Sequence, residues 1–104
     1  MTSDEAVAAF SASPVDRQIA VLARFAFEMT IVARGTYVPG TEDVADPQRL
    51  RLLNERQHRV TGHICHLLDG GTKRSDGGSI VRTVVAEDDA ELLKAFEAAI
   101  RRSG

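Results

Sequence analysis

The chain has 104 residues, of which 43% are hydrophobic and 27% charged, and its formal net charge is −2 at pH 7. This composition is that of a globular protein, and residues 1–104 suffice for one domain with a modest core, which argues against intrinsic disorder. One cysteine excludes an internal disulfide, and the acidic N-terminus is unlike a secretory signal, so we expect a soluble cytoplasmic protein. The most apolar stretch, residues 19–33, is shorter than a bilayer requires, so we expect no membrane span.

The first half of the chain predicts a short helix followed by a long one. Residues 3–11 carry apolar side chains at helical spacing. Ser13-Pro14 is a typical helix start, with Ser13 as the N-cap and Pro14 as the first helical residue, which predicts a helix over residues 14–35. From residue 19 to residue 33 this helix is apolar nearly all round, so it needs several neighbours.

The second half predicts another long helix and two shorter ones. Asp46-Pro47 repeats the start signal, and Gly70-Gly71 ends a helix over residues 47–69. Residues 79–86 are predicted as a short helix from their apolar spacing, although their β-branched side chains equally suit a strand. Asp88 and Glu91 have the spacing of a capping box and start a last helix over residues 89–102.

These elements predict an all-α fold. Pro39-Gly40 predicts a tight turn between the two long helices, which then form an antiparallel hairpin. Short N-terminal and C-terminal helices complete a helical bundle, either alone or by dimerisation. We predict a homodimer, because one hairpin partner cannot cover the apolar surface of the first long helix.

The charges are divided along the chain. Residues 47–74 carry an excess of arginine and lysine, whereas residues 1–46 and 75–104 are acidic. We expect the basic helix to pair with its acidic neighbours in the fold or in a second subunit. Nucleic-acid binding is disfavoured, because the total charge is negative and no aromatic residues lie among these arginines.

The residue types with the richest chemistry lie in one part of the predicted helix over residues 47–69. All three histidines and the only cysteine fall between His58 and His66. A helical projection places His63 at the edge of a group that faces away from the hairpin core. The members of this group are Glu55, His58, Gly62, Cys65 and His66. Glycine within a helix costs about 1 kcal/mol relative to alanine, which favours close approach of another element, so we interpret these five residues as an interface.

Metal or small-ligand binding is the alternative hypothesis. Glu55 and His58 form a Glu-x-x-His pair of the kind found in carboxylate-bridged di-metal bundles. Glu28 on the other long helix is the candidate for a further ligand, and a symmetric dimer doubles the set. The pair is common by chance and Arg24 lies one turn from Glu28 as a ready partner, so we predict no metal and no cofactor.

Catalysis by Cys65 has less support. Cys65 and His58 are seven residues apart on the helix, and the resulting rise of about 10 Å is too long for a hydrogen bond between them. Nothing in the sequence supplies an oxyanion-stabilising pocket. We therefore expect a non-enzymatic protein-interaction or regulatory module that acts as a homodimer; the sequence does not identify another protein partner.

Overall fold

The computed structural model describes residues 2–70, 82 and 89–103, which form four helices and no strand. These helices are α1 (Ser3–Ser11), α2 (Val15–Arg34), α3 (Pro47–Leu68) and α5 (Ala90–Arg102). Each agrees with the predicted range to within one residue at either end, and the all-α prediction is confirmed. The helix predicted over residues 79–86 lies outside the described residues, apart from Arg82.

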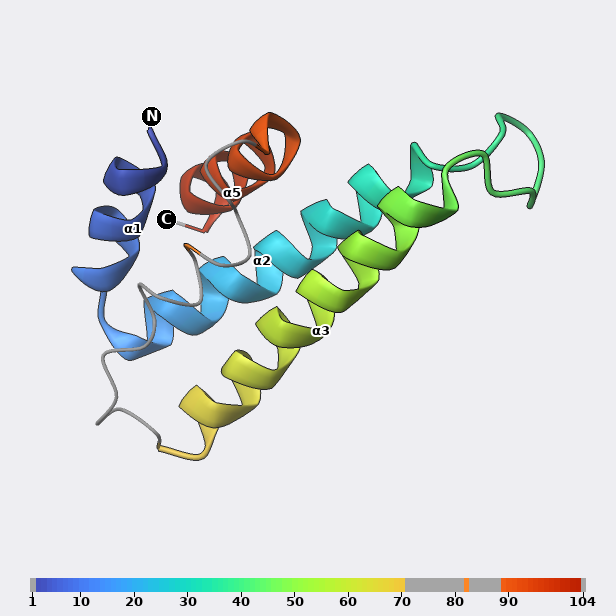
Figure 1. The fold of residues 1–104 in the computed structure, drawn as a ribbon. Helices are drawn as coiled ribbons and strands as arrows, with labels where there is room; N and C mark the ends of the chain where they lie inside the picture. Colours follow the sequence, from blue (N-terminus) through green and yellow to red (C-terminus); the bar gives the residue numbers. More distant parts are fainter. Residues whose placement is uncertain (1, 71–81, 83–88, 104) are drawn as a thin grey trace.

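Helix α2 is the central element of the bundle (Figure 1). Helix α3 runs antiparallel beside it and forms the predicted hairpin, while α5 packs along a different side of α2. Helix α1 lies next to α5 and also contacts α2. The long central helix therefore has neighbours on two sides.

Acidic and hydroxyl side chains fix three of the helix starts. Thr2 and Glu5 form a capping box at α1, in which each side chain accepts a hydrogen bond from the backbone N–H of the other. Asp46 caps α3 by accepting a hydrogen bond from the backbone N–H of Arg49. Asp89 caps α5, so the prediction that placed the start signal at Asp88 was one residue early.

The start of α2 differs from the prediction. The Ser13 hydroxyl donates to the carbonyl oxygen of Ala9 at 2.9 Å instead of capping α2, and Pro14 is the N-cap, without a side-chain hydrogen bond. The amide of Gln18 donates to the carbonyl oxygens of Phe10 at 3.1 Å and Ser13 at 3.0 Å. A side chain one turn into α2 thus holds the end of α1, which the local signal at Ser13 does not reveal.

Three aromatic rings from three helices meet in the core. Phe96 of α5 packs edge-on against Phe25 of α2, with ring centroids 5.1 Å apart, and its centroid lies 6.0 Å from that of Phe10 in α1. All three side chains are at most 1% exposed. Leu53 and Val60 of α3 extend the core along the hairpin. The core therefore joins α2 to all the other described helices.

The connection between α2 and α3, residues 35–46, contains a tight turn at its tip. The backbone N–H of Thr41 donates to the carbonyl oxygen of Val38 at 3.1 Å, and Gly40 has a φ of 76°. Proline at the second position and a left-handed glycine at the third are typical of a type II turn. The tight turn predicted at Pro39-Gly40 is confirmed.

The aromatic cluster gives the first prediction. Phe96→Ala is expected to lower the free energy of unfolding by about 3–5 kcal/mol, because it removes a fully buried ring from between two others. The control is Phe27→Ala, which truncates a phenylalanine that is 51% exposed and is expected to cost less than about 1 kcal/mol. Urea denaturation monitored by circular dichroism measures both values, and equal losses would contradict the packing described.

Candidate interaction surface

One stripe of α2 is exposed along the whole helix. Phe27 and Ile31, one turn apart in this stripe, are 51% and 48% exposed. Single exposed apolar side chains are ordinary, but neighbouring large ones form a patch of the kind that marks interaction sites. At the 100° advance per residue of a helix, the stripe lies away from the residues that α2 buries against α5. Its members are Asp16, Ala20, Ala23, Phe27, Ile31 and Arg34, all of them exposed.

A second exposed stripe runs along α3. It also lies on the side away from α5, because α3 faces α5 through Arg49 and Arg56, which are on the other side of the helix. The members of this second stripe are Arg51, His58, Gly62, Cys65 and Asp69, again all exposed. Both stripes thus lie on the side of the hairpin that the described helices leave exposed, although the Ser103 hydroxyl at the end of α5 reaches the Ala20 carbonyl oxygen at 3.4 Å. We call the two stripes together the open face.

A side-chain hydrogen bond sets the register of the open face. The amide of Gln57 donates to the carbonyl oxygen of Ala26 at 2.8 Å and to the hydroxyl of Thr30 at 2.9 Å, so Gln57 lies level with the middle of that turn of α2. Antiparallel helices of equal rise then form rows across the hairpin. From the inter-helix loop to the opposite end, these rows are Arg34 with Arg51, Phe27 with His58, Ala23 with Gly62, Ala20 with Cys65, and Asp16 with Asp69.

The five residues predicted as an interface do not all lie on the open face. His58, Gly62 and Cys65 do, whereas Glu55 lies at its border and accepts a hydrogen bond from Arg59 at 2.9 Å. His66 is half-buried, and its Nε2 atom is buried without a hydrogen-bond partner among the described residues.

His63, expected at the edge of the group, is 8% exposed. Its ring lies beside that of His66, with the centroids 5.7 Å apart. The polar side chains of α3 therefore occupy two different environments, one open to solvent and one enclosed.

Gly62 has no close neighbour in the described part of the chain. Apart from its chain neighbours and the backbone of its own helix turns, a Cβ atom built at this position meets no described atom within 4 Å. The backbone approach expected from the sequence is therefore not made by α2, and the helix-propensity cost of this glycine has no compensation among the described intramolecular contacts.

The alternative metal set is not assembled in one chain. Glu28 is 9% exposed and accepts hydrogen bonds from Arg24 at 3.1 Å and Arg102 of α5 at 2.7 Å. Glu55 and His58 are instead exposed on α3. Among the described residues, no group of three or more His, Cys, Asp and Glu side chains is able to hold a metal ion.

The strongest charge cluster joins α3 to α5. Arg49 donates to both carboxylate oxygens of Asp89, at 2.7 and 3.0 Å, and to Glu91 at 3.3 Å. Arg56 reaches the same aspartate at 3.2 Å. The expectation that the basic helix pairs with acidic neighbours is confirmed here. The sequence alone does not identify these partners. The seven-residue spacing of Arg49 and Arg56 predicts that both lie on one side of α3, but not which acidic residue they bind.

This cluster shifts the pKa values of its members. Burial of the Asp89 carboxylate acts to raise its pKa, but the hydrogen bonds from Arg49 and from the Leu92 backbone, with the charges of Arg49 and Arg56, lower the pKa below its ordinary value. The hydrogen bond to Asp89 raises the pKa of Arg49 in return. Both charged forms are thereby stabilised in the fold.

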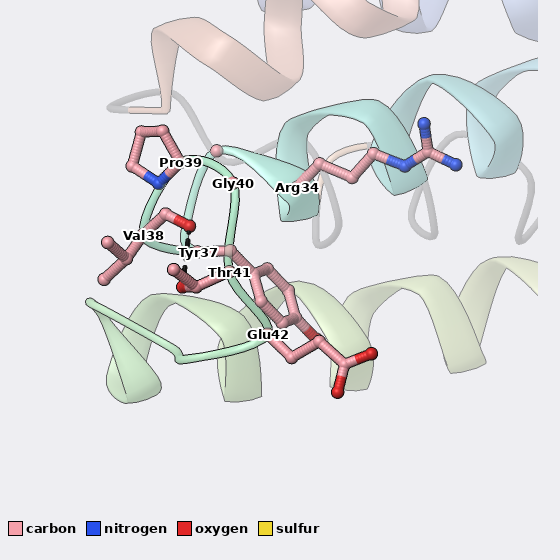
Figure 2. Close-up of a pocket in the computed structure, with 8 residues that line it drawn as sticks. Arg34, Tyr37, Val38, Pro39, Gly40, Thr41 and Glu42 are labelled. Carbon is pink, nitrogen blue, oxygen red and sulfur yellow. Dashed lines mark hydrogen bonds between the residues drawn. The ribbon is translucent and has the colours of Figure 1, made fainter.

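The inter-helix loop lines an open surface pocket of about 600 Å³ (Figure 2). Its lining comes from the end of α2 and from the turn, including Tyr37, Val38 and Pro39. Figure 2 shows the side chain of Arg34 leaving the rim and extending away from Val38 and Pro39. None of the residues of the alternative ligand hypothesis, Glu28, Glu55 and His58, lines this pocket.

Comparison with known proteins adds no relative. Searches of protein-family models, of curated proteins and of solved structures each found no match to this chain. None of the described helices is both long and apolar enough to cross a membrane.

The cluster at Asp89 generates a prediction about pH. Asp89→Asn keeps an N-cap that is as good as aspartate but removes the charge that Arg49 and Arg56 bind, so it is expected to lower the unfolding free energy at pH 7 by about 1–3 kcal/mol. The pKa of Asp89 is lower in the folded than in the unfolded chain, so this stabilisation is present above about pH 4 and is lost as the pH falls through the lowered pKa.

Urea titrations of wild type and variant between pH 2.5 and pH 7 measure the effect. The two unfolding free energies are expected to converge at the acid end. Asp43→Asn, at an exposed loop position, is the control and should follow wild type throughout. A constant gap between Asp89→Asn and wild type across the pH range would contradict the electrostatic origin.

Proposed function

We propose that this protein is a non-enzymatic interaction module that acts as a homodimer through the open face. The observation that carries the proposal is the juxtaposition of exposed Phe27 and Ile31 with a helix-interior glycine, on the one side of the hairpin that faces away from α5. An apolar centre with charged residues at its margins is the usual composition of a protein interface. These features favour binding of another protein molecule over catalysis.

The size of the open face suits a modest dimer. Helices of 20 and 22 residues rise about 1.5 Å per residue and are about 10 Å across, so the pair presents roughly 30 by 20 Å. That area, about 600 Å², approaches the roughly 800 Å² per partner of a standard interface. We therefore propose a dimer with an interface of modest size, whose dissociation constant is to be measured by sedimentation equilibrium.

The chemically reactive side chains of this surface are open to water. His58 and Cys65 are both exposed on α3, where the enclosure that most catalytic sites use to exclude water is lacking. This setting favours a binding role over a catalytic one. It also favours the cytoplasm as the location, because an exposed thiol stays reduced there.

Gly62→Leu tests the proposed interface. The larger side chain has open space in the monomer and a better helix propensity than glycine, so the fold should remain intact or gain stability. On the open face it holds a second molecule away, so the dimer dissociation constant is expected to rise at least tenfold. Sedimentation equilibrium measures the association, and thermal unfolding of dilute samples measures the fold.

Phe27→Glu is the second variant, because it places a charge in the apolar centre, and it should also dissociate the dimer. Val38→Glu is the matched control: it replaces an apolar side chain that is 41% exposed, in the inter-helix loop outside the open face, and should leave association unchanged. A wild-type protein that stays monomeric at 0.5 mM, or a dimer indifferent to both open-face variants, refutes the proposal.

A further inference from the structure

The open face carries opposite charges at its two ends. Arg34 and Arg51 form the row nearest the inter-helix loop, and Asp16 and Asp69 form the row at the other end. None of these four side chains makes an ion pair with another described residue. The charged groups at both ends are thus available to a molecule that packs on the open face.

Side-chain size also changes along the open face. The rows next to the basic end contain the bulky Phe27, His58 and Ile31. The rows next to the acidic end contain Ala20, Ala23, Gly62 and Cys65, all of them small. Within the two stripes the basic half therefore carries the larger side chains; Leu68, which is 66% exposed, lies on α3 between the acidic half of its stripe and α2.

When a second copy of the open face is turned end for end, its charges and its side-chain sizes complement those of the first. We infer that a second copy of this chain covers it, related by a two-fold axis that lies in the interface, perpendicular to the helices and level with Phe25. This inference rests on the proposed function and adds the orientation of the dimer. Helix α2 then packs antiparallel on α2 of the partner, and α3 on its counterpart, which gives a four-helix arrangement.

The axis pairs each end of one subunit with the opposite end of the other. Counted from this axis, Arg34 lies over Asp16 of the partner subunit and Arg51 over Asp69 of the partner subunit. The two-fold symmetry repeats both contacts, so four pairs of opposite charge border the interface.

The same axis seats bulky residues on small ones. Phe27 lies over Ala23 of the partner subunit, and His58 over Gly62 of the partner subunit. Gly62, whose Cβ position meets no atom of another described element, thereby acquires a neighbour that would offset its helix-propensity cost.

A two-fold axis parallel to the helices gives the competing dimer. It places Arg34 over Arg51 of the partner subunit and Asp16 over Asp69 of the partner subunit, so like charges meet at both ends. Like charges facing each other across an interface cost free energy, which disfavours this orientation.

Charge reversal separates the two orientations. The acidic variant Arg34→Glu/Arg51→Glu places acid on acid at both ends of the inferred dimer, and its dissociation constant at 50 mM salt is expected to be about tenfold higher than that of wild type. The basic variant Asp16→Lys/Asp69→Lys should weaken association similarly. The quadruple variant, which exchanges the charges of the two ends, restores every opposite-charge pair and should return to within about threefold of wild type.

Two further experiments test the orientation: a matched control variant, and the salt dependence of the wild-type dimer. Lys94→Glu/Arg101→Glu makes the same change in net charge as the acidic variant, at exposed positions of α5 outside the open face, and should dimerise like wild type. Raising the salt from 50 to 500 mM should weaken the wild-type dimer, because it screens attraction; the competing orientation predicts tightening. This second readout holds even if a charge-reversed chain fails to fold.

The outcomes distinguish this inference from the proposed function. An acidic variant as tightly dimeric as wild type, with a wild-type dimer that strengthens in salt, overturns the inferred orientation. If Gly62→Leu and Phe27→Glu still dissociate that dimer, the open face remains the interface and only the axis is wrong. If those two variants also have no effect, both the proposed function and this inference fail.

Discussion

The structure depends on the need of α2 to bury apolar surface on more than one side. From residue 19 to residue 33 the helix has apolar side chains around most of its circumference, and no single neighbour covers such a helix. Helix α3 covers one side, and α5 with α1 covers a second, where Phe25 and Phe96 form the centre of the core. On the third side Phe27 and Ile31 stay about half exposed, and the Arg24 guanidinium lies 4.9 Å from the centroid of the Phe27 ring. The open face thus includes the apolar side of α2 that the other described helices leave exposed.

Helix boundaries were predictable because the signals that set them are local. Asp46-Pro47 combines a capping carboxylate with a proline at the first helical position, and both act within one turn. At Ser13 the local signal gave the wrong cap, because Gln18 competes for the same turn by holding the end of α1. A motif of two residues does not contain that contact, whose partners belong to two helices. The N-cap prediction at Ser13 was wrong because a contact between two helices, not the local sequence, determines this helix start.

The candidate surface was predictable in part, for a related reason. Helical spacing placed His58, Gly62 and Cys65 on the side of α3 away from the hairpin core, since spacing follows from helix geometry alone. The enclosure of His63 and the pairing of Arg49 with Asp89 depend on which elements lie beside α3, and spacing does not supply that information. Likewise the apolar excess of α2 predicted several neighbours without saying that Phe27 and Ile31 would remain about half exposed.

Two local costs in the isolated chain have a common explanation. A glycine within α3 gives up about 1 kcal/mol of helix propensity relative to alanine, and exposed Phe27 and Ile31 forgo the burial that large apolar side chains gain in a core. The register of the hairpin puts Gly62 and Phe27 in adjacent rows across the two helices, so the proposed partner would contact both. In the proposed dimer, association would offset both costs together, because a bulky side chain of the second copy would occupy the space above the glycine.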